Sequence, residues 1–313
     1  MTPLIQLTDL VKHYRGTHAL RGVNLNVYPG ITGLLGPNGA GKSSLIKILL
    51  GLVRVSGGSA SVLGLHPHRH GRQIRNRIGY MPESDCYLPG LTGIEVVQFS
   101  AGLSGLPRLE GLRRSHEILD FCSMGQERYR NIETYSTGMR QKIKFAAAIV
   151  HDPELLILDE PTSGLDPEER ESLLNRISHL HHQFGKSILL STHILPDVQS
   201  TCHQVVIIAD GRVLVDQDLG TLNRQNSPAM TVRGCGDQDG FFRALSAANL
   251  QATQQPDGAI VVVSASDESP ALPQSIWHAA RQSGYSVQAL TSATKSLEDV
   301  FLHAVREASH AHS

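Results

Sequence analysis

The stretch "GLLGPNGAGKSSLIKILLG", residues 33–51, places four glycines within nine residues, ahead of a lysine, two serines and an apolar run. Glycine loses more conformational freedom on folding than any other residue, so such a cluster indicates a tight loop or a backbone that approaches a ligand closely. The preceding "ITGLLG" (residues 31–36) is typical of a buried strand, and "KSSLIKILLG" (residues 42–51) is typical of a helix. The stretch therefore predicts a strand, a glycine-rich loop and a helix in succession.

The spacing within this loop matches the phosphate-binding P-loop, in the strand–loop–helix context that makes the motif credible. The first N–H groups of a helix are unpaired and favour an anion. Lys42 is expected to reach the terminal phosphates, and the Ser43 hydroxyl is expected to ligate Mg²⁺. The alternative is an ordinary glycine-rich turn, which the rest of the chain argues against. The ATP-binding residues expected here are Gly36, Pro37, Asn38, Gly39, Ala40, Gly41, Lys42, Ser43 and Ser44.

The stretch "LLILDEP", residues 155–161, supplies the acidic groups that a nucleotide hydrolase needs. Four apolar residues predict a buried strand, with Asp159 and Glu160 at its carboxyl end, the edge where ligands of parallel sheets bind. We expect Asp159 to hold Mg²⁺ and Glu160 to polarise the attacking water as a general base. A solvated acidic turn is the alternative interpretation.

Short apolar runs and helical periods alternate up to about residue 216, which predicts an α/β fold with a mainly parallel sheet. The region up to Tyr28 resembles antiparallel strands, and Asp210 with Gly211 predicts a hairpin between residues 204–209 and 212–217. Residues 92–150 carry helical patterns and are interpreted as a helical insertion. Asp166 is the expected N-cap of the helix that starts with Pro167.

The composition changes after Leu219, where residues 220–230 are polar and loop-like. The order that follows is βαββαβ, a split βαβ arrangement, with a last helix predicted over residues 296–308. We therefore expect an ATPase core in residues 1–220, and a linker with a small α+β domain in residues 221–313.

The overall composition excludes several classes of protein. The chain has 313 residues, 40% of them hydrophobic and 18% charged, which indicates a globular protein. A net charge of −1 gives no sign of nucleic-acid binding. We see no signal peptide and no apolar run of the roughly 20 residues that would cross a bilayer. The four scattered cysteines predict reduced thiols, and the histidine clusters "HPHRH" and "HLHH" favour polar surface over a metal site.

The longer stretch "YSTGMRQKIKFAAAIVHDPELLILDEPTSGLDP", residues 135–167, resembles the nucleotide-binding subunits of ABC transporters. The signature motif of that family usually reads Leu-Ser-Gly-Gly-Gln. Here Ser136 and Gly138 match it, whereas Tyr135, Thr137 and Met139 depart from it. The resemblance covers about residues 3–220.

The resemblance also assigns roles to single residues outside the P-loop. Tyr14 matches the aromatic residue that stacks on adenine, although a half-buried strand tyrosine is an alternative. Glu83 in "IGYMPE" stands where the family has a glutamine, and it is expected to touch Mg²⁺ or water. Asp166 lies in the D-loop "SGLDP", and His193 matches the switch histidine that contacts the γ-phosphate. The resemblance thus implies Glu160, His193 and Glu83 as catalytic residues.

In this family the signature loop contacts the nucleotide held by a second subunit. The resemblance therefore implies that two copies, or this chain and a relative, sandwich two ATP molecules. It also implies a separate transmembrane permease and a peripheral location on the cytoplasmic face of the membrane. The ending "SLEDVFL", residues 296–302, is similar to that of exporters paired with ABC-2 membrane proteins, although import stays possible.

Two further function classes compete with a transporter subunit. A soluble ABC ATPase acting on ribosomes or DNA usually carries two cassettes, long arms or zinc cysteines. Here there is one P-loop, and Glu83 and Ser136 are only 53 positions apart, so no nucleic-acid partner is expected. A non-catalytic regulatory subunit is disfavoured because Lys42, Asp159, Glu160 and His193 are all present.

Overall fold

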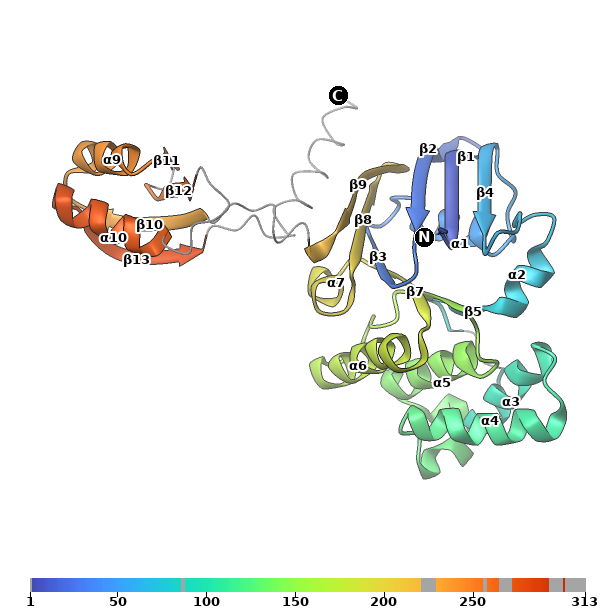
Figure 1. The fold of residues 1–313 in the computed structure, drawn as a ribbon. Coiled ribbons are helices and arrows are strands. Elements are labelled where there is room, and N and C mark those ends of the chain that lie inside the picture. Colours follow the sequence, from blue (N-terminus) through green and yellow to red (C-terminus); the bar gives the residue numbers. More distant parts are fainter. Residues whose placement is uncertain are drawn as a thin grey trace. The chain divides into compact units, whose positions relative to one another are not determined.

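The computed structural model describes residues 2–85, 88–220, 229–255, 258–264, 272–292 and 301. The chain divides into two compact units, and the division falls between Leu219 and Gly220 (Figure 1). Each unit has a hydrophobic core of its own.

A six-stranded sheet forms the centre of the first unit, and it is parallel except at one edge, where β9 runs antiparallel to β8. All residues of β3, β6 and β7 are buried, as strands covered on both faces require. The mainly parallel sheet expected from the sequence is confirmed. In spatial order the strands are β5 (Ile78–Met81), β6 (Leu155–Asp159), β7 (Ser187–Thr192), β3 (Ile31–Leu35), β8 (Gln204–Ala209) and β9 (Arg212–Asp218).

A second, antiparallel sheet contains the N-terminal strands, in the order β2 (Thr17–Val27), β1 (Ile5–Tyr14) and β4 (Gly57–Val62). The antiparallel pairing expected up to Tyr28 is confirmed, and β4 is a strand that the sequence analysis had not identified. Buried side chains of α1 (Lys42–Leu49) join one core with residues from both sheets. The helix that follows the glycine-rich loop is therefore held on two sides.

The register of the parallel strands brings their carboxyl ends to one edge of the sheet. Leu35 at the end of β3 pairs with Thr192 of β7 and Ile207 of β8. Asp159 at the end of β6 pairs with Ser191 of β7. The loops after β3, β6 and β7 consequently emerge side by side, as ligand-binding loops of parallel sheets do.

Further helices of this unit are α2 (Gly71–Arg77), α6 (Pro167–Phe184) and α7 (Leu195–Thr201). The predicted start of α6 is confirmed, because the Asp166 carboxylate accepts a hydrogen bond from the Glu169 N–H at 2.8 Å. Pro167 occupies the first turn, where its missing N–H costs nothing. Gly185 ends the helix in the left-handed conformation.

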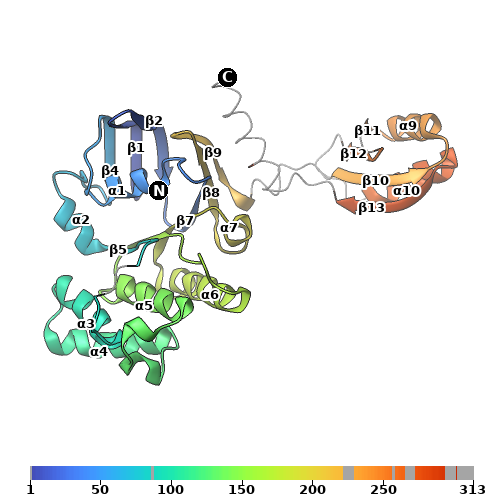
Figure 2. The same ribbon diagram turned by 180° about the vertical axis from the view of Figure 1, so that it is seen from behind.

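The helical insertion lies on the side of the six-stranded sheet away from β1, β2 and β4 (Figures 1 and 2). A capping box opens its first helix, since the Thr92 N–H donates to Glu95 at 2.8 Å and lowers the pKa of that carboxyl. Within the described part of residues 92–150 no strand is present. The insertion consists of α3 (Gly93–Leu103), α4 (Arg108–Phe121), two 3₁₀ turns (Gln126–Tyr129 and Ile132–Thr134) and α5 (Thr137–Ile149).

The second unit follows the βαββαβ order, with an antiparallel sheet in the spatial order β11-β12-β10-β13. Phe241 and Tyr285 stack at 4.5 Å between ring centroids in its core. The expected α+β class of this region is confirmed. Its elements are β10 (Ala229–Cys235), α9 (Gln238–Ala247), β11 (Leu250–Gln254), β12 (Ile260–Ser264), α10 (Leu272–Ser283) and β13 (Ser286–Ser292).

The last helix expected from the sequence, residues 296–308, lies outside the described residues except for Phe301. Most of the polar segment 220–230 also lies outside them. In the part of the chain that the structure describes, no helix has both the length and the apolar character needed to cross a membrane.

Candidate nucleotide-binding and hydrolysis site

A cavity of about 460 Å³ opens at the sheet edge where the carboxyl ends of the parallel strands meet. It gathers the glycine-rich loop, both acidic residues after β6, and Tyr14 and Glu83. The sequence-predicted residues that line it are Tyr14, Pro37, Asn38, Gly39, Ala40, Gly41, Lys42, Ser43, Ser44, Glu83, Asp159 and Glu160.

Two glycines of the loop, Gly36 and Gly41, are required by the backbone that packs against them. A Cβ at Gly36 would lie 2.3 Å from the carbonyl oxygen of Ile208, and one at Gly41 would lie 2.6 Å from that of Ala19. Gly41 also has a φ of 108°, which side chains rarely adopt. The sequence left open a tight loop or a backbone that approaches a ligand closely, and the contacts at Gly36 and Gly41 show that the tight loop by itself requires glycine at these two positions.

The ammonium of Lys42 lies inside the loop, with 6% of the residue exposed. Its Nζ donates to the Gly36 carbonyl at 2.6 Å and to the Pro37 carbonyl at 3.3 Å. It also lies 3.7 Å from a carboxylate oxygen of Glu160. A buried cation so close to the first N–H groups of α1 makes this end of the cavity electropositive.

Asp159 and Glu160 follow one another at the end of β6, and both are buried. Burial raises the pKa of the Asp159 carboxyl above its ordinary value. The neighbouring charges of Glu83 and Glu160 raise it further, whereas Lys42 acts in the opposite direction. Glu83 and Glu160 line the same cavity as Asp159, so the cavity carries negative charge near Asp159.

Glu160 adopts a backbone conformation with a φ of 49°, which is uncommon for a residue that is not glycine. Its N–H donates to the Ser191 carbonyl of β7 at 2.9 Å, which holds the strained residue in place. The sequence carried no signal for this conformation. It turns the chain sharply after β6 and presents the Glu160 carboxylate to the cavity.

His193 follows β7 and reaches Glu160 from the neighbouring strand. Its Nδ1 lies 2.9 Å from Oε2 of Glu160, and about half of the His193 side chain (51%) is exposed. The carboxylate therefore lies between Lys42 on one side and His193 on the other. Two partners thus orient the carboxylate that the sequence predicts to be the general base.

One wall of the cavity is made by residues that the sequence analysis did not select: Thr17, His18, Ala19, Arg21, Asp210 and Gly211. The β8–β9 turn supports the loop, because the Gly211 N–H donates to the Ala40 carbonyl at 3.0 Å. The sequence did show this hairpin turn, but not its neighbours. Tyr14 is 41% exposed, and Lys12 lies 4.7 Å from its ring centroid.

The signature residues Ser136, Thr137, Gly138 and Met139 form the start of α5, and none of them is among the residues that line this cavity. Ser136 caps the helix, since its hydroxyl accepts the Met139 N–H at 3.2 Å. A Cβ at Gly138 would lie 2.0 Å from the carboxylate of Glu169, so a side chain there would displace this carboxylate where α5 meets α6. The structure therefore separates the signature residues from the nucleotide cavity of the same chain.

The loops of the site are tied together by a buried carboxylate that the sequence analysis missed. Asp197 of α7 is 1% exposed, and it accepts hydrogen bonds from Thr162 Oγ1 and Arg170 Nε, each at 2.5 Å. Thr162 follows Glu160 closely and Asp197 follows His193 closely. The network thereby fixes the segment after β6 against the segment after β7.

The donors at this site suit Mg²⁺, which prefers hard oxygen ligands and keeps several water or phosphate oxygens. Ser43 and Asp159 offer such oxygens, and so does Glu83. Among the described residues no group of three or more His, Cys, Asp or Glu side chains is arranged to hold a metal ion. The site therefore fits an ion that the nucleotide helps to bind rather than one held in a protein cage.

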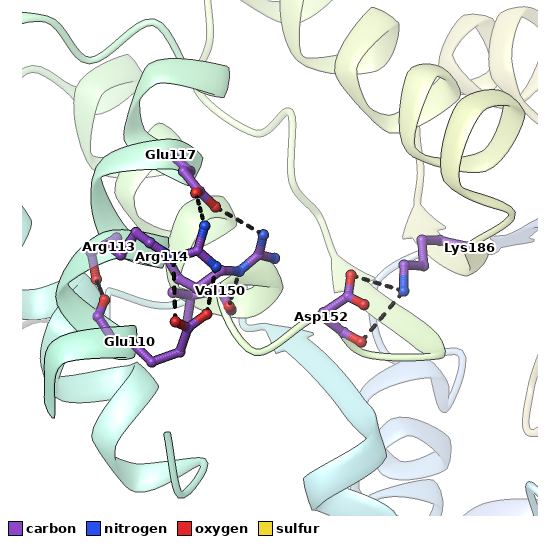
Figure 3. Close-up of polar contacts among 9 residues, drawn as sticks. Glu110, Arg113, Arg114, Glu117, Val150, Asp152 and Lys186 are labelled. Atoms are coloured by element: carbon purple, nitrogen blue, oxygen red, sulfur yellow. Dashed lines mark hydrogen bonds and ion pairs between the residues drawn. The ribbon is translucent and has the colours of Figure 1, made fainter. Parts of the chain in front are cut away.

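A larger cavity, about 600 Å³, lies between the insertion and the core and involves none of the residues above. Its rim consists of ion pairs, Arg113 with Glu110 at 2.7 Å and Lys186 with Asp152 at 3.0 Å (Figure 3). The first pair lies within α4 and the second lies within the core, so neither joins α4 to the core.

Comparison with known proteins agrees with this geometry. The family model described as "ABC transporter" matches residues 20–163. The chain is 34% identical over 306 residues to the daunorubicin/doxorubicin resistance ATP-binding protein DrrA of Streptomyces peucetius, covering 96% of this chain and 92% of that protein. It is 33% identical over 304 residues to the uncharacterized ABC transporter ATP-binding protein YdbJ of Bacillus subtilis, covering 96% and 95%.

Among solved structures, the ATP-binding subunit of an ABC transporter matches with a TM-score of 0.64 and 32% identity, covering 71% of this chain and 92% of that chain. The fold and the site define a P-loop ATPase. The chain belongs to the ATP-binding proteins of ABC transporters, so the expected family and enzyme class are confirmed.

Proposed function

We propose that the chain hydrolyses ATP with Mg²⁺ while two subunits close around two nucleotides, and that closure drives a separate membrane permease in export. The observation that carries this proposal is the presence of Lys42, Asp159 and Glu160 at one cavity, with His193 in contact with Glu160. Mg²⁺ bound there would neutralise phosphate charge and orient the nucleotide.

In this mechanism Glu160 accepts the proton of the attacking water. Its carboxylate is held between Lys42 at 3.7 Å and His193 at 2.9 Å, so little reorganisation is needed before the reaction. The His193 ring can donate to Glu160 and to a phosphate at once only as an imidazolium, because a neutral ring has a single N–H. Lys42 stabilises the charge that develops on the terminal phosphate.

The position of the signature residues supports assembly with a second subunit. Ser136–Met139 offer a capped helix start that is absent from the cavity lining of their own chain. A second copy would bring the same helix start to the phosphate and complete the site. Asp166, which caps α6 beside this region, would lie close to the contact between subunits.

The helical insertion supports contact with a membrane partner. Leu103 at the end of α3 and Leu109 at the start of α4 are 73% and 80% exposed, and Phe99 on α3 is 49% exposed. Apolar side chains exposed together mark sites for protein partners. We place the permease contact on these residues, which would locate the chain peripherally at the cytoplasmic face of the membrane. The drug-resistance name of the relative DrrA supports the proposal of export.

The central experiment uses Glu160→Gln, which removes the base and preserves the shape of the side chain. This variant should bind ATP and accumulate as a dimer in light scattering, because hydrolysis no longer releases the nucleotide. The control is Glu171→Gln, the same change on an exposed part of α6, which should hydrolyse ATP normally. A Glu160→Gln protein that binds ATP but stays monomeric would contradict the sandwich.

The permease is tested by purifying the tagged chain from gently solubilised membranes and identifying its partners by mass spectrometry. A stoichiometric membrane protein should be recovered with the wild type and with Leu52→Asp, a change at a distant exposed leucine, but not with Leu103→Asp. Recovery of ribosomal proteins or nucleic acid instead would establish the soluble ATPase.

A further inference from the structure

A buried lysine connects the signature helix to the residue at which this chain departs from its family. Lys144 lies on α5, two turns beyond Ser136, and is 5% exposed. Its Nζ donates to the carbonyl of Glu83 at 2.8 Å and to the carbonyl of Ser84 at 3.4 Å. The side chain therefore holds the backbone of the segment after β5 against α5.

A lysine at this place has to be explained, since burying an ammonium is costly unless hydrogen bonds compensate it. An apolar side chain would fill the same space without that cost. Gln141, one turn earlier on α5, is also buried, and its Nε2 donates to the Ser163 carbonyl at 3.2 Å. One face of α5 thus forms hydrogen bonds with the backbone of two loops of the nucleotide site.

The hydrogen bond from Lys144 fixes the backbone of Glu83. It lines the nucleotide cavity, and its charge contributes to the raised pKa of Asp159. A small shift of the backbone at Glu83 would move a carboxylate toward or away from the place of the metal ion. The position of Glu83 therefore has to be fixed more firmly than that of a neutral side chain.

We propose that Lys144 is a positioning residue that fixes Glu83 at the cavity and makes its position depend on the signature helix. The inference rests on the proposed function, because it assigns Lys144 to the same hydrolysis reaction. In the proposed dimer, Ser136–Met139 of this chain contact the nucleotide held by the second subunit. Through α5 and Lys144, that contact would then affect the position of Glu83 in the chain's own site.

The test compares Lys144→Met with Arg140→Gln in ATPase assays over a range of ATP and Mg²⁺ concentrations. Arg140 is a suitable control because it joins the same two segments through an exposed ion pair with Asp85 at 3.4 Å. Exposed ion pairs of this kind contribute little to the free energy of folding. We expect Lys144→Met to lower kcat about tenfold, equivalent to about 1.4 kcal/mol. The variant should also need a higher Mg²⁺ concentration for half-maximal ATPase activity, whereas its affinity for ATP should stay within about twofold of the wild-type value. Arg140→Gln should match the wild type.

A double-mutant cycle with Glu83→Gln separates positioning from a general structural effect. If Lys144 acts through Glu83, the effect of Glu83→Gln should largely disappear in the Lys144→Met background. Additive effects, or a Lys144→Met enzyme with wild-type kcat and Mg²⁺ dependence, would overturn the inference. If Lys144→Met does not fold, Lys144→Gln, whose amide keeps an N–H donor group without the charge, replaces it in the same cycle. A wild-type chain without ATPase activity would instead refute the proposed function.

Discussion

The substitution Asp197→Asn tests whether the buried network between the two catalytic loops is as important as its geometry indicates. The change removes the negative charge and preserves the size of the side chain. The amide oxygen can still accept from Thr162, but the ion pair with Arg170 is lost. Position 197 is 1% exposed and both of its hydrogen bonds measure 2.5 Å. Water therefore cannot enter on the side of residue 197 to compensate for the lost ion pair with Arg170.

The expected magnitude follows from these contacts. A hydrogen bond to a charged group contributes about 1.5–3 kcal/mol, and breaking a buried ion pair costs more. The Arg170 side chain is 28% exposed, so water compensates part of the loss. We expect Asp197→Asn to lower the free energy of unfolding by about 2 kcal/mol. For a domain of this size that corresponds to roughly 4–8 °C in Tm.

Urea unfolding of the purified chain, followed by circular dichroism, measures this loss. The control is Glu154→Gln, which breaks an exposed bidentate pair with Arg77 that has both contacts at 2.7 Å. Exposed pairs contribute about 1 kcal/mol or less, so the control should change stability much less. The reasoning fails if Asp197→Asn costs no more than Glu154→Gln.

Three further predictions concern single groups. Asp159→Asn should stabilise the protein at pH 7, because the pKa of the Asp159 carboxyl is raised in the folded state and its ionised form therefore destabilises the fold above that pKa. The gain in stability should shrink as the pH falls toward the ordinary pKa of a carboxyl group. Urea unfolding midpoints over a series of pH values check the sign of this effect. Tyr14→Ala should weaken binding of ATP more than that of free triphosphate in calorimetry, and equal losses would favour a purely structural tyrosine. Among the three described cysteines, iodoacetamide at pH 7.5 should modify the exposed Cys235 and spare Cys122 and Cys202. Burial raises the pKa of each of these two thiols to about 12. Peptide mass spectrometry identifies the labelled site, and rapid labelling of either buried thiol would contradict its burial.

The sequence by itself determined the local features of this protein. The strand, loop and helix around Lys42, the capped start of α6 at Asp166 and the hairpin at Gly211 all depend on neighbours within a few residues. Backbone preference and hydrophobic period act over that range, so patterns reveal them. The order of elements in the second unit could be predicted for the same reason, whereas β4 of the first unit was missed.

Only the tertiary structure decided which distant residues meet. His193 contacts Glu160 across 33 residues because β6 and β7 are neighbours in the sheet, and no local pattern specifies that order. Lys144 reaches Glu83 across 61 residues, and Gly36 is needed because Ile208 passes beside it. The sequence indicated the candidate site residues, whereas strand order and register determined their partners, because contacts between strands depend on the packing of the whole core.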